Sequence, residues 1–206
     1  SPLPDSALVL SQLRQLFPQV IEQDFVLSSK IYALPLYIDT LALIYNKDIF
    51  DAGSVALTPK IWLDFQNLIP KLKQTNILNQ LTRPAAAIGG SNVSIDSASD
   101  LLNLLMLQFD SQFVNSSGEI NFGREGLSAF NFYLQFADPN NQYYTWNDNL
   151  GSSLNSFSQA QTAMIFNYAS SLPLIKQKNP YLNIDVSPMP QFNLSQPVNF
   201  ANYWGL

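Results

Sequence analysis

Apolar residues along this chain follow two different periods, the alternation of strands and the longer spacing of helices. The strand pattern is clearest after Ile31. Ile31–Leu34 alternates as a strand does, and Leu41–Asn46 is a nearly continuous apolar run. A run of this kind fits a strand that is covered on both faces of a sheet. The polar segment Pro35–Thr40 lies between these two segments. Because both of its neighbours require burial, this segment is predicted to cross between two parts of the fold.

The rest of the pattern predicts strands that alternate with helices. Helices are expected over 6–17, 47–53, 62–73, 98–109, 124–138, 153–161 and 172–178, and strands over 85–88, 162–167, 184–186 and 198–206. Asp5 or Ser6 is expected to cap the first helix, and Asn46 the second. Leu127, Phe130 and Leu134 follow helical spacing, so their stripe is expected to face the core.

The next helix is expected to open at Thr58 and Pro59, since proline is tolerated in a first turn. Pro70 should kink or shorten that helix, because it removes one amide bond. Trp62 and Tyr45 each lie on an apolar stripe and are predicted to be core residues. Asn115 is expected to begin a turn. These elements together indicate an α/β fold with a mixed sheet flanked by helices.

Composition excludes several classes of function. Of the 206 residues, 47% are apolar and 12% charged, so the chain has enough apolar surface to fold. The net charge is −5 without any long basic cluster, which makes nucleic acid a poor partner. Cysteine and histidine are both absent, so disulfides, thiolate metal sites, the usual zinc sites and Ser-His-Asp catalysis are excluded. We expect no metal, no cofactor and no enzymatic activity.

One enzymatic alternative does not need histidine. Two carboxylates can hydrolyse a glycosidic bond, and Asp39 together with Asp148 or Glu119 could be proposed for that role. Nothing in the spacing of these acids supports the pairing. A carbohydrate-active hydrolase is therefore kept as an alternative reading only.

Three segments carry a resemblance to a known family. They are YALPLYIDTLALIYNKDIFDAG followed by PKIWLDF, then FSQAQTAMI at residues 157–165, and VSPMP at residues 186–190. In this order they resemble the extracellular solute-binding proteins of ABC importers, in the cluster that includes maltose-binding protein. The resemblance implies a periplasmic-binding-protein-like II fold, with one lobe largely complete and the other partial.

The resemblance also implies a domain organisation. Residues 1–40 would form part of the first lobe and the outward hinge, residues 41–187 the second lobe, and residues 188–206 the return hinge and the start of a first-lobe strand. The chain is then expected to be cut, with half of the ligand cleft absent and tight binding lost. No apolar run reaches the roughly 18 residues needed to cross a bilayer, and any export signal or anchor is expected upstream.

By the same resemblance, the protein would be a solute-binding receptor. It would capture a small polar ligand, with a sugar as the first candidate, in an interlobe cleft and deliver it to the permease subunits of an ABC importer. It would be an extracytoplasmic monomer that meets the membrane only through an anchor outside this chain. A surface adhesion or sensor domain that reuses the fold is the second alternative.

Candidate ligand-binding residues come from two arguments. Sugars bind to flat aromatic faces and to planar amide or carboxylate groups, and Trp146 lies among tyrosines and asparagines in a polar loop. The alternative interpretation of Trp146 is that its ring packs back on the domain. The resemblance places Tyr37 and Asp39 in the cleft beside the hinge, although Asp39 could instead only cap a turn.

Four further positions follow from the resemblance. Ser91 and Asn92 come after Gly89 and Gly90, where relatives often contact ligand, but a solvated loop would explain them as well. Tyr168 lies near the place of a stacking tryptophan in some sugar-binding relatives. The matching position here is Ser170, so that aromatic platform is absent or displaced. Trp204, in the last predicted strand, could reach the cleft or belong to the core.

Overall fold

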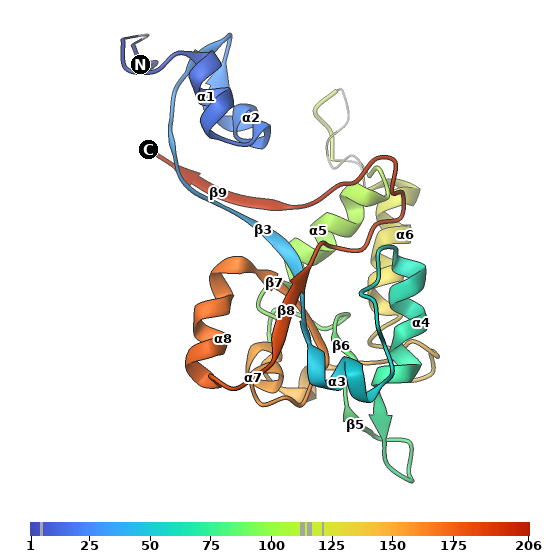
Figure 1. Cartoon of the computed structure of the whole chain (residues 1–206). Helices are drawn as coiled ribbons and strands as arrows, with labels where there is room; N and C mark the ends of the chain where they lie inside the picture. Colours follow the sequence, from blue (N-terminus) through green and yellow to red (C-terminus); the bar gives the residue numbers. More distant parts are fainter. Residues whose placement is uncertain (5, 112–113, 115–116, 121) are drawn as a thin grey trace. The chain divides into compact units, whose positions relative to one another are not determined.

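In a computed structural model, the chain forms two compact units (Figure 1). The structure describes residues 1–4, 6–111, 114, 117–120 and 122–206, so the predicted cap Asp5 and the first residue of the predicted turn, Asn115, lie outside it. Unit 1 comprises Ser1–Thr40 and Ala201–Leu206, and unit 2 comprises Leu41–Phe200. Strand β3 (Pro35–Asn46) begins in the first unit and ends in the second. The segment predicted as a crossing is therefore part of one long strand.

Unit 1 is built around a small apolar cluster. Its elements are α1 (Leu10–Leu16), η1 (Gln19–Ile21), α2 (Glu22–Phe25), β1 (Val26–Leu27), β2 (Lys30–Ile31), the first half of β3, and β9 (Ala201–Gly205). Leu13, Ile21 and Ile31 are buried in it. Of the predicted strand over residues 31–34, only Ile31 lies in a strand, β2, which pairs with β1 in a short hairpin.

Unit 2 contains the mixed sheet that the sequence predicts. Its strand order is β6 (Ala86–Ala87), β7 (Met164–Tyr168), β3 and β8 (Ile184–Ser187). β6 runs parallel to β7, whereas β7 and β8 are antiparallel to β3. Leu41, Leu43 and Ile44 of β3 are fully buried, as a strand covered on both faces requires.

Helices cover this sheet. They are α3 (Lys47–Ala52), α4 (Trp62–Leu72), α5 (Ala98–Gln108), α6 (Gly123–Leu134), α7 (Ser153–Ser158) and α8 (Leu172–Lys178), with the short turns η2 (Asp148–Leu150) and η3 (Ala169–Ser171). Asn46 caps α3 as predicted, since its Oδ1 accepts the amides of Asp48 and Ile49. α4 begins at Trp62 rather than at Thr58, without a side-chain cap. A hairpin of β4 (Gln74–Thr75) and β5 (Leu81–Arg83) was not predicted.

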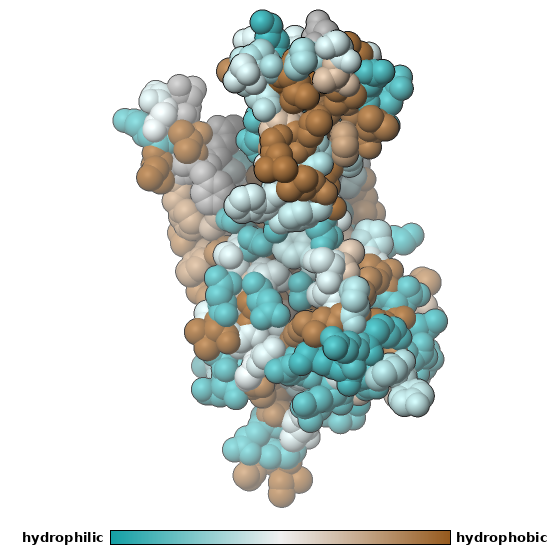
Figure 2. All heavy atoms as spheres, turned by 90° about the vertical axis from the view of Figure 1, so that its left-hand side faces the viewer, coloured by the Kyte–Doolittle hydropathy of each residue, from teal (hydrophilic) through white to brown (hydrophobic). Residues whose placement is uncertain are grey.

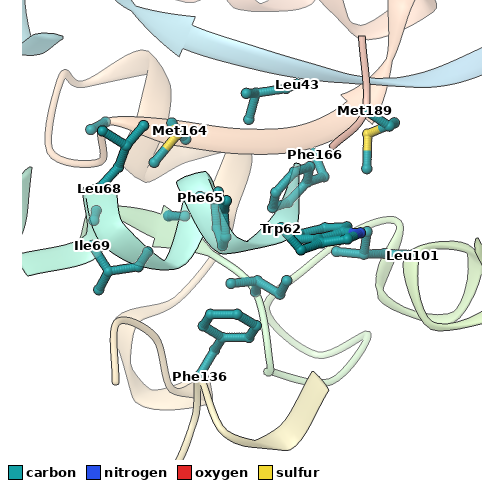
Figure 3. Close-up of a cluster of buried hydrophobic side chains, with 14 of the residues drawn as sticks. Leu43, Trp62, Phe65, Leu68, Ile69, Leu101, Phe136, Met164, Phe166 and Met189 are labelled. Atoms are coloured by element: carbon teal, nitrogen blue, oxygen red, sulfur yellow. The ribbon is translucent and has the colours of Figure 1, made fainter. Parts of the chain in front are cut away.

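The main core lies between α4 and the sheet. Figure 3 shows the rings of Trp62 and Phe65 gathered with those of Phe136 and Phe166. The centroids of Phe65 and Phe136 are 5.5 Å apart in an edge arrangement, which is favourable for aromatic pairs. Trp62 is buried as predicted, and its indole N–H donates to Gln108. Tyr45 is half-buried against the same cluster.

The prediction for the apolar stripe of α6 was wrong. Leu127, Phe130 and Leu134 are 51%, 37% and 40% exposed. The buried face of the helix instead carries Gly126, Ala129 and Tyr133. A methyl group on Gly126 would lie 3.1 Å from the Ser111 hydroxyl. Small residues thus allow the close approach of this face, Tyr133 is the large side chain buried on it, and Leu127, Phe130 and Leu134 are left outside.

Residues 188–200 belong to unit 2, whereas the predicted second lobe ended at residue 187. The reason is a set of backbone hydrogen bonds to the start of α4. The Gln191 amide donates to the Lys60 carbonyl, and the Trp62 amide donates to the Gln191 carbonyl. Met189 is buried in the main core. The assignment of the two units to the two lobes of a binding protein stays a prediction.

Candidate functional site

In unit 1, the pairing of β3 with β9 groups several of the predicted binding residues. Tyr37 lies opposite Trp204, and Asp39 lies opposite Asn202. Because side chains two positions apart share a face of a strand, these four residues lie on one face of the ladder. We call them the ladder face.

The opposite side of this ladder is occupied by core contacts. Ile38 and Tyr203 alternate with the ladder-face residues and pack against the unit 1 cluster. The Tyr203 hydroxyl donates to Asp24 Oδ2 at 2.6 Å. Burial, followed by that carboxylate, raises the pKa of Tyr203 to about 12. Anchoring on one side leaves the other side for solvent or a ligand.

The ladder face combines the groups that sugar recognition requires. Tyr37 is 48% exposed and Trp204 is 66% exposed, so both rings are accessible within unit 1. Asp39 and Asn202 add a carboxylate and an amide beside them, and one carboxylate oxygen of Asp39 accepts the Thr40 amide at 2.9 Å. An aromatic face can cover sugar C–H groups while planar polar groups bind hydroxyls.

Unit 2 contains a separate open pocket of about 460 Å³ between α5, α6 and the loop after β6. Its lining combines apolar helix side chains with polar loop residues: Gly89, Gly90, Ser91, Asn92, Ala98, Ser99, Leu102, Phe130, Tyr133, Leu134 and Asp148. A large concave site with a few convergent polar groups is the usual form of a small-molecule site. The predicted residues Ser91 and Asn92 therefore both line this pocket.

Two glycines allow the pocket wall to form. Gly89 has a φ of 93°, and a Cβ there would lie 2.8 Å from the Ala137 amide nitrogen. A Cβ on Gly90 would lie 2.8 Å from Asp148 Oδ1 and 2.9 Å from Trp146 Cδ1. The loop can approach α6 and residues 146–148 only because both side chains are absent. The Gly90 carbonyl accepts a hydrogen bond of 2.6 Å from the buried Tyr133 hydroxyl.

Asp148 is the charged group of this pocket. Its carboxylate accepts the Ser94 hydroxyl at 2.6 Å, and the Ser91 amide and hydroxyl at 2.8 Å each. These donors, the Ser94 hydroxyl foremost, hold the pKa of Asp148 below its ordinary value. Asp148 is thus an ionised carboxylate with fixed orientation.

Trp146 lies behind the pocket, and its predicted role as an exposed stacking platform was wrong. The side chain is 0% exposed, and its indole N–H donates to Ser94 Oγ at 3.0 Å. Its sequence neighbours are polar, but Ile44, Phe157 and Ile165 from other elements surround it in a buried cluster. The ring therefore supports the Ser94 hydroxyl that binds Asp148.

Asn92 and Tyr168 are both tied to the first turn of α5. Asn92 Oδ1 accepts the Ser99 amide at 3.2 Å, and the half-buried Tyr168 donates its hydroxyl to Asp100 Oδ2 at 2.7 Å. Ser170, the position matched to a stacking tryptophan, is exposed. Tyr168 and Asn92 thus have structural partners, and their part in ligand binding stays a prediction.

The predicted residues therefore fall into groups. Tyr37, Asp39 and Trp204 share the ladder face of unit 1, Ser91 and Asn92 line the pocket of unit 2, and Tyr168 and Trp146 lie elsewhere in unit 2. Sequence reasoning missed Asn202, Tyr133 and the binding role open to Asp148. Strand alternation with Trp204 could have identified Asn202. No local pattern identifies the other two, because both depend on contacts across unit 2.

The described residues include no group of three or more Asp or Glu side chains that could hold a metal ion. None of the helices in the described ranges is long and apolar enough to cross a bilayer.

Comparison with known proteins gives a family for this fold. The family model of the bacterial extracellular solute-binding proteins matches residues 4–206. No curated protein sequence matches the chain significantly. Solved structures resemble it at low identity, so they show the fold alone, which is the periplasmic-binding-protein-like II fold.

Three of these structures illustrate the likeness. An ABC transporter solute-binding protein from Thermotoga lettingae bound with α-D-tagatose shares 20% identity at a TM-score of 0.67, over 95% of this chain and 51% of that chain. UgpB from Mycobacterium tuberculosis, in complex with glycerophosphocholine, shares 17% at a TM-score of 0.69, over 95% and 47%. The maltotriose-binding protein of Thermus thermophilus shares 18% at a TM-score of 0.60, over 92% and 47%. The chain thus spans about half the length of these proteins.

Proposed function

The chain belongs to the bacterial extracellular solute-binding proteins, and from this premise we propose that it is part of a receptor that binds a small polar solute, with sugars as the first class to test. The receptor would deliver that solute to the permease subunits of an ABC importer. It would act outside the cytoplasm as a monomer, with any membrane anchor outside these residues.

The observation that carries this proposal is the register of β3 and β9. It sets the exposed rings of Tyr37 and Trp204 beside the carboxylate of Asp39 and the amide of Asn202. Such a surface suits a ligand with C–H faces and many hydroxyls better than a purely ionic or purely apolar ligand. The structural relatives bound with tagatose and maltotriose support the same class.

We further propose that the ligand is enclosed between the two units. The ladder face would supply the aromatic contacts, and the unit 2 loop with Ser91, Asn92 and Asp148 would supply hydroxyl and carboxylate partners. Ligand would then act by favouring a closed arrangement over an open one. A permease would recognise that closed arrangement.

Asp148 does not fit the role of the proton donor in a glycoside hydrolase. A glycoside hydrolase needs one carboxylic acid that remains protonated, which requires a raised pKa. The hydrogen bonds from Ser94 and Ser91 lower the pKa of Asp148 instead. This carboxylate is suited to accept hydrogen bonds rather than to donate a proton.

Tryptophan fluorescence offers a direct test of solute binding. Trp62 and Trp146 are at most 1% exposed, whereas Trp204 is 66% exposed, so a ligand on the ladder face changes the emission of Trp204 first. The 206-residue chain is titrated with monosaccharides, disaccharides, amino acids and short peptides. Because half of the ligand cleft is expected to be absent, we expect a weak but saturable change with at least one sugar, and no product by chromatography.

Two variants locate the binding surface. Trp204→Ala or Tyr37→Ala should weaken the sugar response in calorimetry about tenfold or more, because each removes one aromatic face. Tyr32→Ala is the matched control, since Tyr32 is 45% exposed in unit 1 but lies outside the ladder. No saturable response to any solute, or equal loss in all three variants, would reject the proposal.

A further inference from the structure

The hairpin of β4 and β5 ends in two apolar side chains that contact little else. Ile77 is 99% exposed and Leu78 is 70% exposed. The hairpin is the lowest part of unit 2 in Figure 1, and the corresponding projection in Figure 2 ends in apolar atoms. Scattered apolar residues on a surface need no explanation, but two adjacent ones at the end of a projection do.

Hydrogen bonds hold this tip in one conformation. Asn76 Oδ1 accepts the amides of Leu78 and Gln80 at 2.9 and 3.0 Å, and its Nδ2 donates to the Gln80 side chain. The Asn76 amide donates to the Gln80 carbonyl, and the Asn79 amide donates to the Asn76 carbonyl. Asn79 has a φ of 58°, which asparagine tolerates. A partner therefore meets a tip that is already ordered, so binding loses little entropy.

The same end of unit 2 is rich in cations. β6, β7 and β8 all start where β3 ends, as the pairs Ala86↔Met164 and Asn46↔Ile184 show. The segments before these strands and after β3 therefore share one end of the sheet, which we call the basic end. Six of the ten cations of the chain lie at the start of α3, at the ends of α4 and α8 and in β5, which flank these segments: Lys47, Lys71, Lys73, Arg83, Lys176 and Lys178. Four carboxylates lie in the same elements, in β8 or just after α6: Asp48, Asp51, Asp138 and Asp185.

These cations are not neutralised by ion pairs within the described part of the chain. Several bind carbonyl groups instead, as Lys73 does at Gln142 and Tyr144, and Lys176 at Leu182. Such bonds fix the side chains but leave the positive charge. The chain as a whole has a net charge of −5, so the excess of cations at the basic end is a local reversal of sign.

We propose that the basic end docks on an anionic lipid surface, with Ile77 and Leu78 inserted between the headgroups. An apolar tip beside cations is the combination by which peripheral proteins bind such membranes. Tyr181, which is 95% exposed in the loop before β8, adds an aromatic side chain of the type enriched at membrane interfaces. This contact is independent of solute binding and would be added to any anchor outside the chain.

The dimensions of the tip favour lipid over a protein groove. A specific protein interface buries about 800 Å² on each partner around a desolvated centre, and two side chains on a narrow hairpin offer far less. A bilayer accepts single apolar side chains, and distributed charges attract it without shape complementarity.

Vesicle co-sedimentation of the 206-residue chain tests the proposal. We expect the protein to sediment with vesicles of phosphatidylcholine and phosphatidylglycerol at low salt, and much less with pure phosphatidylcholine or at high salt. The double variant Ile77→Asn with Leu78→Asn should reduce the partition coefficient about tenfold or more. Leu194→Asn is the matched control, since Leu194 is 58% exposed in a loop outside the basic end and should have no effect.

A variant that lacks two cations separates electrostatic attraction to the lipid from insertion of the apolar tip. Lys176→Gln with Lys178→Gln should reduce partition about fivefold or more at low salt, and Arg124→Gln on α6 should not. Circular dichroism confirms that each exposed substitution leaves the fold intact. If the tip instead fits a protein groove, the wild type should not sediment with protein-free anionic vesicles. That result would overturn the proposal. The proposal would also be overturned if the double variant Ile77→Asn with Leu78→Asn sedimented as much as the wild type.

Discussion

Replacement of Trp146 by alanine distinguishes a core residue from a ligand platform. The side chain is fully buried among Ile44, Phe157 and Ile165, and it donates a hydrogen bond to Ser94. A platform residue would affect affinity and leave stability unchanged. A core residue would do the reverse, and the structure predicts this second outcome.

The size of the effect follows from burial. Removal of a buried tryptophan or phenylalanine side chain costs about 3–5 kcal/mol, because transfer free energy and packing are both lost. The broken hydrogen bond to Ser94 adds about 1 kcal/mol. Folded domains are stable by about 5–15 kcal/mol, so this change removes a large share. With a urea dependence of about 2 kcal/mol per molar, the combined loss of about 4–6 kcal/mol lowers the midpoint of unfolding by about 2–3 M.

Urea unfolding followed by circular dichroism measures this shift. Trp146→Phe is the informative second variant, since it keeps most of the ring and removes the N–H donor to Ser94, so it should cost about 1–2 kcal/mol. Trp204→Ala is the control, because a side chain that is 66% exposed should change stability by about 0.5 kcal/mol or less. A Trp146→Ala midpoint equal to that of the wild type would refute the assignment of Trp146 to the core.

Three further predictions concern the pocket of unit 2. Gly90→Ala should destabilise the fold by about 1–3 kcal/mol in urea titrations, because its methyl group would lie 2.8 Å from Asp148 Oδ1 and 2.9 Å from Ser94 Oγ. Asp148 has a lowered pKa, so it contributes stability above the ordinary value of 3.8 and loses that contribution as the pH falls through its folded value. The difference in melting temperature between wild type and Asp148→Asn should therefore shrink below pH 3.8, and a constant difference would contradict this. Tyr133→Phe should cost about 1 kcal/mol, because it removes the hydroxyl that binds the Gly90 carbonyl. Burial raises the pKa of Tyr133, so the wild type should also lose stability as the pH rises above 10 and the variant should lose less.

The α/β fold could be predicted from the sequence wherever the pattern was local. The apolar run of β3 gave a fully buried strand, and Asn46 capped α3. The stripe on α6 misled, because periodicity shows that a helix has an apolar face without showing which face is covered. Gly126 and Ala129 provide the close contact there, and the larger Leu127 remains outside.

The candidate site was predictable only in part. The resemblance pointed to Tyr37 and Asp39, and strand pairing set Trp204 opposite the first of them. Trp146 was misplaced because its apolar neighbours come from strands and helices outside its own loop. For the same reason the role of Asp148 could not be predicted from its neighbours in sequence, since its hydrogen-bond donors precede it by more than fifty residues.

The discontinuity of unit 1 has a consequence for the order of folding. Its last strand, β9, pairs with residues 35–40 although about 160 residues intervene, and a loop of that length is entropically costly to close. Unit 2 removes most of that cost, since the Leu41 amide donates to the Phe200 carbonyl and the Asn199 side chain donates to the Leu41 carbonyl. Folding of unit 2 therefore brings the two halves of the ladder to each other, and the ladder face should form last and open first.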